Sequence, residues 1–220
     1  MRKNKIKTLI KMFVPPILLI IKQKVSDLII KHKFSENLFN GYNLLFKKSL
    51  SSNCIYGEYG CGQSTIYVLK KFNIPIFSVD SSKYWINKLK KICNKKKLNI
   101  SYIDVGNINP YAWGAPDDFS KRYNFYKYAQ NIWKQKLKPN VVLIDGRFRV
   151  LCFLTSLKLC DENTKIIFDD YNDRKYYHVV EELIKPKEND GRQALFIVNK
   201  KKINFKKLEF LLNKFEYIYD

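Results

Sequence analysis

The sequence predicts an α/β fold, a doubly wound and mostly parallel sheet of seven strands preceded by a helical extension. Three observations predict it. From residue 53 onward, short apolar runs alternate with stretches of helical periodicity, the order that gives right-handed βαβ units. A glycine-rich turn, Glu58-Tyr59-Gly60-Cys61-Gly62, follows the first run. The 220 residues, 46% of them hydrophobic, suffice for one such domain with its own core.

The first 33 residues differ from the rest in charge and pattern. They carry nine Lys or Arg residues against one acid, Asp27. The apolar run from Met12 to Ile21 is shorter than the roughly 20 residues of a membrane-spanning helix. Beyond Pro15-Pro16, apolar residues recur at helical spacing opposite lysines, which is typical of an interfacial amphipathic helix. Two interpretations stay open: peripheral contact of residues 1–33 with an anionic membrane, or packing of this helix on the domain.

Charge and cysteine content limit the partners and the compartment. The net charge of +21 favours polyanionic partners, although solvated lysine-rich faces would give the same total. No basic run with interleaved aromatics lies on a recognisable nucleic-acid fold, so we do not expect nucleic acid to be a partner. The five cysteines are odd in number and lack CxxC spacing, which argues against a disulfide framework or a zinc site. We expect a reducing, cytoplasmic location, peripheral on the inner membrane face if residues 1–33 bind lipid.

Seven short runs are predicted as strands because they are apolar and end at turn residues. The expected strands are Cys54–Gly57, Ile76–Val79, Ile100–Asp104, Val141–Asp145, Lys165–Phe168, Ala194–Val198 and Phe215–Tyr219. The stretches between them place apolar residues three and four positions apart, as helices do. The expected helices are Ser64–Phe72, Lys83–Asn94, Phe148–Leu159, Asp173–Ile184 and Phe205–Leu212.

One stretch, residues 106–139, interrupts this alternation. It is too long for an ordinary strand-to-helix loop, and long insertions in α/β folds commonly cover the site at the carboxyl ends of the strands. Lys121–Lys136 within it has helical periodicity. We therefore divide the chain into a basic amphipathic extension, residues 1–50, and a domain of residues 51–220 that carries this insertion.

The glycine-rich turn lies between an expected strand and an expected helix. Glycines there let the backbone turn sharply and approach a ligand closely. The next strand ends at Asp80, about 20 residues after Gly60, where an acid meets the hydroxyls of a ribose. The combination predicts a Rossmann-like, nucleoside-binding domain. The alternative is a tight turn with a solvated Glu58.

Two residues favour S-adenosylmethionine as the nucleoside. Thr65 stands where a dinucleotide fingerprint has its third glycine, and the chain has no phosphate-binding Gly-x-x-x-x-Gly-Lys-Ser/Thr loop. Glu58 would repel a pyrophosphate but suits the sulfonium and amino groups of S-adenosylmethionine. Asp104, at the end of the third strand, is placed to bond the adenine amino group. The predicted cofactor-binding residues are Glu58, Gly60, Cys61, Gly62, Asp80, Ser81, Asp104, Val105 and Asp145.

Three acids follow the fourth and fifth expected strands: Asp145, Asp169 and Asp170. Carboxylates brought together at strand ends can bind a hard divalent cation such as Mg²⁺, which takes oxygen ligands and would activate a substrate hydroxyl. Alternatively, Asp145 is a general base with a raised pKa, or the acids pair with arginines. We name Asp145, Asp169 and Asp170 as candidate metal ligands, and the arginines that could pair with them instead are Arg147, Arg149 and Arg174.

Further residues near these strands are candidates for catalysis and substrate binding. His178 follows the fifth strand and could accept a proton, although a structural histidine is the alternative. The candidate catalytic residues are Asp145, His178 and Asp170. Arg147 and Arg149 could bind an acidic substrate group, and Tyr111 and Trp113 in the insertion could cover the acceptor and exclude water.

Taken in order, Glu58-x-Gly60-x-Gly62, Asp80, Asp104 and Asp145 resemble the motifs of class I S-adenosylmethionine-dependent methyltransferases over residues 53–199. More narrowly, four motifs resemble a bacterial subgroup of that family: Trp113-Gly114-x-Pro116, Asp145-Gly146-Arg147-Phe148-Arg149-Val150, Asp169-Asp170-Tyr171 and Gly191-Arg192-x-Ala194.

Two resemblances bear on the substrate and the metal. Pro15-Pro16-Ile17-Leu18-Leu19 is similar to the leader of methyltransferases encoded in surface-polysaccharide clusters, which implies a sugar or glycan-precursor acceptor near the inner membrane. Asp145 with Asp169-Asp170 resembles the metal-dependent O-methyltransferases, although these usually have Asp-Asn at the second position.

Together these features predict an S-adenosylmethionine-dependent O-methyltransferase that acts on a sugar, a glycan precursor or another small molecule. One alternative is a non-catalytic Rossmann-like module of a membrane-associated glycan assembly complex, which would have no cofactor affinity. The other is a nucleic-acid methyltransferase, whose binding to RNA or DNA would depend strongly on salt.

Overall fold

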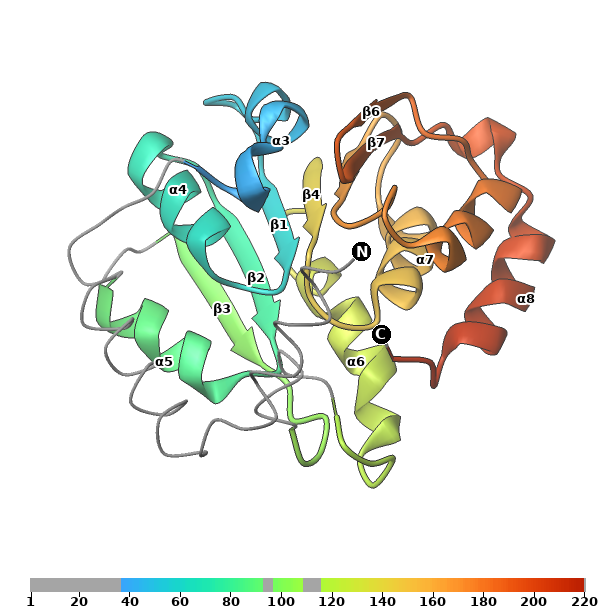
Figure 1. Ribbon diagram of the computed structural model, residues 1–220, viewed down its shortest axis with the longest axis horizontal. Helices are drawn as coiled ribbons and strands as arrows, with labels where there is room; N and C mark the ends of the chain where they lie inside the picture. Colours follow the sequence, from blue (N-terminus) through green and yellow to red (C-terminus); the bar gives the residue numbers. More distant parts are fainter. Residues whose placement is uncertain (1–36, 93–96, 109–115, 220) are drawn as a thin grey trace, which may run out of the picture. The chain divides into compact units, whose positions relative to one another are not determined.

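The computed structural model describes residues 37–92, 97–108 and 116–219 (Figure 1). The predicted amphipathic helix in residues 1–33 and the candidate lid residues Tyr111 and Trp113 lie outside these ranges. In the part of the chain that the structure describes, no helix is long and apolar enough to cross a membrane.

A seven-stranded sheet forms the centre of the domain, as the sequence predicts. Its strands lie in the order β3-β2-β1-β4-β5-β7-β6. The first five are mutually parallel, and β7 runs antiparallel to both β5 and β6. The chain order therefore reverses between β1 and β4, which is where open α/β sheets bind ligands. The strands are β1 (Tyr56–Tyr59), β2 (Ile76–Asp80), β3 (Leu98–Tyr102), β4 (Val141–Ile144), β5 (Lys165–Phe168), β6 (Glu188–Asp190) and β7 (Gln193–Ile197).

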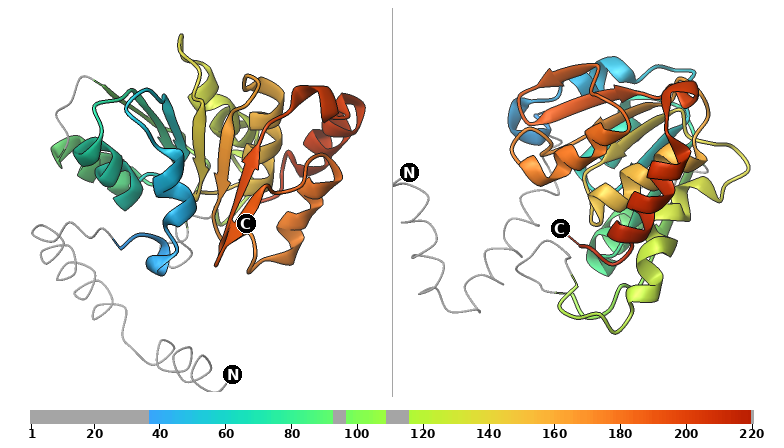
Figure 2. Two further views of the ribbon diagram at one scale, coloured as in Figure 1. Left: turned by 90° about the horizontal axis from the view of Figure 1, so that it is seen from above. Right: turned by 90° about the vertical axis from the view of Figure 1, so that its right-hand side faces the viewer.

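Helices cover both faces of the sheet (Figures 1 and 2). Helices α4 and α5 lie on one face, and α6, α7 and α8 on the other. The α-helices are α3 (Leu44–Ser49), α4 (Gln63–Lys71), α5 (Lys83–Ile92), α6 (Phe125–Gln130), α7 (Arg149–Leu159) and α8 (Phe205–Phe215). Short 3-10 helices are η1 (Phe39–Gly41), η2 (Arg122–Asn124), η3 (Asn131–Trp133), η4 (Lys175–Glu182) and η5 (Lys200–Lys202).

Strands β4 and β5 and helix α7 all contribute buried residues to the apolar core. All four residues of β4 are buried, and α7 is buried along nearly its whole length, as expected of a helix that is apolar on all sides. Phe153 of α7 packs edge-on against Phe196 of β7, with ring centroids 4.7 Å apart. Leu208, Leu211 and Leu212 of α8 belong to the same apolar cluster. This packing fixes the two strands whose ends carry the predicted acids.

Helix α3 packs on the sheet domain just before the first strand. Phe46 is fully buried, and its ring lies 5.9 Å from the rings of both Tyr56 and Tyr67. The compact unit that contains the sheet begins at Asn37. The division of the chain at residue 50 stays a prediction, since most of the extension lies outside the described residues.

Two expected elements differ from the structure. Phe215–Tyr219 is not a strand, because α8 continues through Phe215 and a turn follows. The seventh strand is instead β6, Glu188–Asp190, a three-residue edge strand with mostly exposed polar residues. The helix expected over residues 173–184 is the 3-10 helix η4. The other six expected strands and four expected helices lie within a few residues of their expected bounds.

Candidate active site

Two glycine turns cross at the carboxyl ends of β1 and β4. Gly60 has φ +88°, a conformation that glycine adopts at little cost. A Cβ added to Gly60 would lie 2.6 Å from the Cα of Gly146, so the two turns touch backbone to backbone. Gly62 differs, because a Cβ there would meet no atom within 4 Å and its φ of 175° is ordinary extended backbone. The loop thus leaves open space beside Gly62, directly before helix α4.

The carboxylate of Glu58 lies beneath this loop and is fully buried. Its Oε2 accepts hydrogen bonds from Tyr56 and Ser64, both at 2.9 Å. Its Oε1 accepts from Thr65 at 2.5 Å and from Ser78 at 2.8 Å. Burial raises the pKa of Glu58, and the four hydroxyl donors partly offset that rise.

This geometry corrects the expectation that Glu58 faces the ligand. Four donors occupy its lone pairs and none of its surface is exposed, so it holds the loop from below. Thr65 connects the two, since its hydroxyl also accepts a hydrogen bond from the backbone N–H of Gly62 at 2.9 Å. Thr65, which stands where a dinucleotide fingerprint has glycine, therefore organises the turn.

Asp80 ends β2 beside the glycine loop, as its spacing predicts. Its Oδ2 accepts from the backbone N–H of Cys61 at 2.8 Å, and its Oδ1 from that of Ser82 at 2.6 Å. Burial raises the pKa of Asp80, while the backbone N–H groups lower it. The side chain of Cys61 and the backbone N–H of Ser81 also bond this carboxylate, so Asp80 ties the glycine loop to the end of β2. Cys61 and Ser81 are buried next to it.

Asp104 lies past the end of β3 and is partly exposed. Lys121 forms an ion pair with its carboxylate, and the backbone N–H of Gly106 donates to it at 3.1 Å. These contacts lower the pKa of Asp104. Asn124 donates to its carbonyl at 2.7 Å, so the insertion is fastened to this turn. Val105 is fully buried and belongs to the apolar core.

The three predicted acids at the ends of β4 and β5 lie together, and arginines pair with all of them. Arg149 is nearly fully buried and bonds Asp145 at 3.2 Å and Asp170 at 3.1 Å. It also donates to the carbonyl of Asp169 at 2.7 Å. Asp169 is fully buried, and Arg192 bonds both of its oxygens.

Asp170 completes this cluster in a strained conformation. Its φ is +59°, in the left-handed region that few non-glycine residues adopt. Arg174 and Arg192 pair with its carboxylate at 3.0 Å and 2.5 Å. The carboxylate of Asp170 thus contacts three arginines at once, Arg149, Arg174 and Arg192.

The pairing bears directly on the predicted Mg²⁺ site. Among the described residues, no group of acids, histidines or cysteines is arranged to hold a metal ion. Three guanidinium groups stand against the three carboxylates where a divalent cation was expected, so Asp145, Asp169 and Asp170 do not fit a metal site. Arg149 is likewise not open to a substrate, because it lies at the centre of the cluster. Arg147 remains half-buried beside it.

Comparisons with known proteins decide the family. In a methyltransferase-like protein from Silicibacter pomeroyi DSS-3, 30% of the aligned residues are identical, the match covers 76% of this chain and 89% of that one, and the TM-score is 0.66. The chain belongs to this methyltransferase-like family. No protein-family model matches the sequence, and no curated protein matches it.

Two other solved methyltransferases share less with this methyltransferase-like chain. The N-methyltransferase NodS from Bradyrhizobium japonicum WM9 has 12% identity and a TM-score of 0.42, with 74% of this chain and 97% of that one covered. An S-adenosylmethionine-dependent methyltransferase from Clostridium acetobutylicum ATCC 824 has 13% identity and a TM-score of 0.38, with 89% and 87% covered.

In this methyltransferase-like chain, His178 contacts Tyr171, the residue that follows Asp170. Its ring stacks on that of Tyr171, with centroids 4.6 Å apart, and its Nε2 bonds the carbonyl of Tyr171 at 3.1 Å. Tyr171 in turn donates to Glu181 at 2.8 Å. These contacts fix the ring of His178, which belongs to η4, against Tyr171, and its role as a proton acceptor stays a prediction.

The sequence interpretation missed two residues of the cluster. Arg192 was noted only as part of a family motif, and Gln193, which donates to Asp169 at 3.1 Å, was not noted. Both stand on the β6–β7 hairpin, whose first strand the sequence did not reveal. One feature of the sequence could have indicated Arg192. It lies just before the expected strand Ala194–Val198, and that strand pairs with β5, whose end carries Asp169.

Proposed function

We propose that the chain binds S-adenosylmethionine over the glycine loop and methylates a hydroxyl group of a sugar or glycan precursor. The crossing of the Gly60 and Gly146 turns carries this proposal. It brings the backbone of the β1 loop, Asp80 and Asp145 to one place, at the point where the strand order reverses.

The residues around the loop fit this cofactor. The space beside Gly62 admits a ligand against the backbone, and Asp80 ends β2 at the spacing at which an acid meets the hydroxyl pair of a ribose. The start of α4 offers unpaired backbone N–H groups for a carboxylate. When bound, S-adenosylmethionine supplies an electrophilic methyl group. Glu58 serves from beneath, where it keeps Thr65 and thereby Gly62 in position.

Asp145 is the residue best placed to accept the acceptor's proton. Its side chain is 31% exposed, whereas those of Asp170 and Asp169 are 12% and 0% exposed. Burial and the neighbouring charge of Asp169 raise the pKa of Asp145, and Arg149 partly offsets this. A carboxylate with a raised pKa is a stronger base. Arg149 also fixes the orientation of Asp145 through its hydrogen bond to Oδ1.

The identity of the acceptor rests on sequence resemblance. The motif Pro15-Pro16-Ile17-Leu18-Leu19 resembles the leader of methyltransferases from surface-polysaccharide clusters, which supports a glycan acceptor and a cytoplasmic enzyme that is peripheral to the membrane. No step in the proposal uses Mg²⁺, since the arginines already neutralise the three acids.

Isothermal titration of the whole chain with S-adenosylhomocysteine tests the cofactor. Gly62→Ala should weaken binding at least about tenfold, because its Cβ enters the space beside the loop while the extended backbone keeps the fold. Asp80→Asn should also weaken binding, and Asp161→Asn, at an exposed carboxylate far along the chain, should not. Equal binding in wild type and Gly62→Ala, or heat of binding for NAD but not for S-adenosylhomocysteine, would contradict the proposal. Absence of any binding would favour the non-catalytic module.

A further inference from the structure

The outward face of helix α8 combines exposed apolar side chains with lysines. Leu208, Leu211 and Leu212 bury the opposite face. Outward, Phe210 is 52% exposed, and Tyr217 and Ile218 beyond the helix end are 44% and 49% exposed. We call the set Lys206, Phe210, Lys214, Tyr217 and Ile218 the α8 surface.

Two ammonium groups flank the central ring of the α8 surface. The Nζ atoms of Lys207 and Lys214 each lie 5.5 Å from the centroid of Phe210, within the range of cation–π attraction. Lys206 and Lys214 stand four residues before and after Phe210, so they share its side of the helix. Within the described residues, neither forms an ion pair with an acid. Lys207 does pair with Glu182. An exposed apolar ring flanked by cations is the pattern of an interfacial helix.

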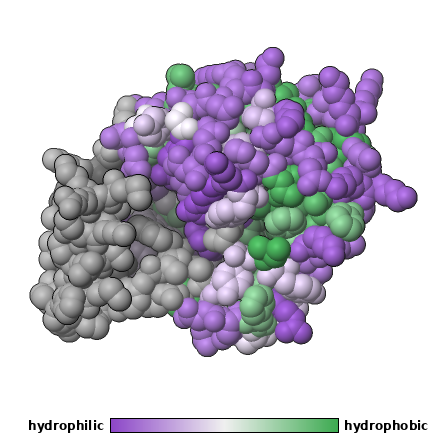
Figure 3. All heavy atoms as spheres, turned by 45° about the vertical axis from the view of Figure 1, so that its right-hand side comes forward, coloured by the Kyte–Doolittle hydropathy of each residue, from purple (hydrophilic) through white to green (hydrophobic). Residues whose placement is uncertain are grey.

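The charge around this surface is one-sided. Residues 200–219 contain six lysines and two acids, Glu209 and Glu216. Lys158 pairs with Glu209 at 2.8 Å, which leaves little negative charge to offset the lysines. Figure 3, in which the α8 side of the molecule comes forward, shows apolar side chains gathered among hydrophilic ones on this face.

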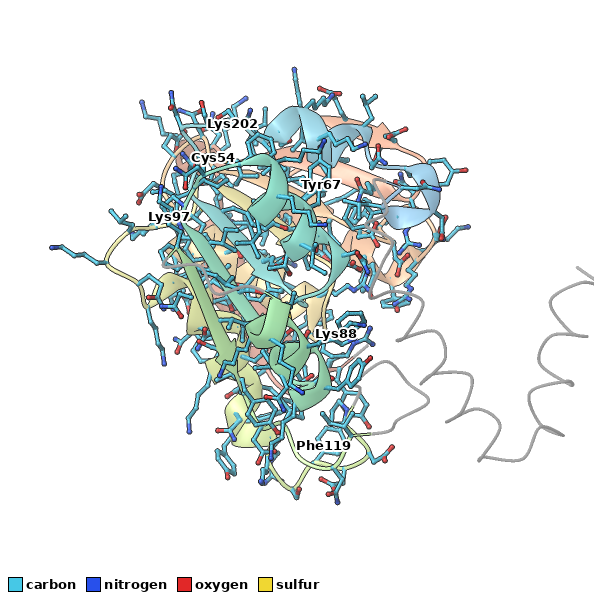
Figure 4. All side chains as sticks on the ribbon, turned by 90° about the vertical axis from the view of Figure 1, so that its left-hand side faces the viewer. Cys54, Tyr67, Lys88, Lys97, Phe119 and Lys202 are labelled. Carbon is cyan, nitrogen blue, oxygen red and sulfur yellow. The ribbon has the colours of Figure 1, made fainter. Side chains whose placement is uncertain are left out.

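The α8 surface continues onto the insertion and reaches the site's end of the molecule. Phe119, 45% exposed, packs against Tyr219 with ring centroids 5.2 Å apart, and the exposed Tyr123 lies under Lys127. In Figure 1, α8 ends on the side to which β1, β2 and β3 point. Figure 4 shows Phe119 at this same edge of the sheet.

We propose that the α8 surface is a second membrane contact, which inserts Phe210 and Ile218 among the headgroups of an anionic bilayer. Charge complementarity selects this occupant, since anionic lipids attract each nearby lysine and the interface accommodates aromatic rings. A second copy of the chain fits less well, because a two-fold interface would place the same lysines against each other. The contact lies in the described domain and is independent of residues 1–33 and of the cofactor.

Co-sedimentation of the whole chain with vesicles tests this contact. Vesicles of phosphatidylcholine with about 30% phosphatidylglycerol should bind the chain, and pure phosphatidylcholine should bind it far less. Phe210→Ser combined with Ile218→Ser should lower the partition coefficient about tenfold, because each apolar side chain loses its transfer into the interface. The matched control is Leu44→Ser with Leu137→Ser, two leucines of similar exposure outside α8, which should change it less than about twofold.

Residues 1–33 are present in every variant, so their contribution to lipid binding stays constant. Circular dichroism and urea unfolding of each variant check that the fold is kept. An unchanged partition coefficient in the α8 variant would overturn the proposal. A change of oligomeric state in sedimentation velocity, with vesicle binding unchanged, would also overturn it and would identify the surface as an interface between copies. Binding of S-adenosylhomocysteine should be the same in both variants, which separates this proposal from the cofactor assignment.

Discussion

At the scale of single residues, buried acids and their partners organise the site. Glu58 has four hydroxyl donors and no positive partner, whereas Asp169 and Asp170 are paired with arginines. Hydroxyls stabilise a carboxylate less than a guanidinium does. Burial raises the pKa of Glu58, and its four hydroxyl donors only partly offset that rise. The charge of Glu58 is thus less well compensated than the charges of Asp169 and Asp170.

The raised pKa of Glu58 makes stability depend on pH. A carboxyl that holds its proton more tightly when folded contributes stability below its ordinary pKa, and this contribution is lost as pH rises toward the folded value. Glu58→Gln cannot titrate, so it should remove the part of the pH-dependent loss of stability that comes from Glu58. Urea unfolding between about pH 4 and about pH 8 should show a smaller loss of free energy in Glu58→Gln than in wild type. Glu162→Gln, at an exposed position, should show the same dependence of unfolding free energy on pH as the wild type. The same pH dependence in the wild type, Glu58→Gln and Glu162→Gln would contradict this account.

The arginine at the centre of the acid cluster should matter for stability. Arg149→Ala leaves Asp145 and Asp170 without their shared partner, and breaking a buried ion pair costs about 3–5 kcal/mol. Since Asp145 is 31% exposed, we expect the lower end of that range. Lys138→Ala breaks an exposed pair with Asp161 and should cost less than about 1 kcal/mol. Urea unfolding measures both, and equal losses would mean that the cluster contributes no more than a surface pair.

The sequence predicted the three acids and two of their possible arginine partners, Arg149 and Arg174, but not Arg192. Asp80 could be found because a strand and a glycine turn precede it at a known distance. Arg192 pairs with Asp169 across a hairpin, and nothing in the local sequence reports that contact. The burial of Glu58 could not be predicted from the local sequence either, because its donors Thr65 and Ser78 come from two different elements.

At the scale of elements, the crossing of the β1 and β4 turns is the most demanding contact. Gly60→Ala combines a left-handed φ of +88° with a Cβ 2.6 Å from the backbone of Gly146. Strain of φ alone costs about 1 kcal/mol, and backbone atoms cannot move aside as a flexible side chain can.

We therefore expect Gly60→Ala to lower the free energy of unfolding by more than about 1 kcal/mol and to abolish binding of S-adenosylhomocysteine. Gly62→Ala, by contrast, should lose binding alone. Urea unfolding and calorimetry of the two variants distinguish steric strain in the fold from obstruction of the ligand. A Gly60→Ala protein of wild-type stability would show that the turns can separate.

The sequence predicted the bounds of strands and helices correctly where the apolar pattern was long. Strand β5 has its expected bounds, and α7 begins within a residue of them. Strand β6 failed because its three polar residues at the sheet edge carry no apolar signal, as is usual for protected edges. Phe215–Tyr219 was mistaken for a strand because its alternating aromatics also suit the amphipathic end of α8 and the turn that packs on Phe119.

At the scale of the whole described domain, the two edges of the sheet have different chemistry. The amino edge carries Cys54, Lys97 and Lys202 (Figure 4). The carboxyl edge carries the glycine turns, the paired acids and the end of the α8 surface. If lipid holds the α8 surface, the candidate site lies close to the bilayer, where an acceptor attached to a lipid would be presented to it.

The strand order has a consequence for synthesis of the chain. Strand β1 lies between β2 and β4, and the Gly60 turn rests against Gly146, which the ribosome adds much later. A nascent chain can pair β1 with β2 early, but its glycine loop has no support on the other side until β4 emerges. During translation the glycine loop therefore gains its support on Gly146 only after β4 has been synthesised.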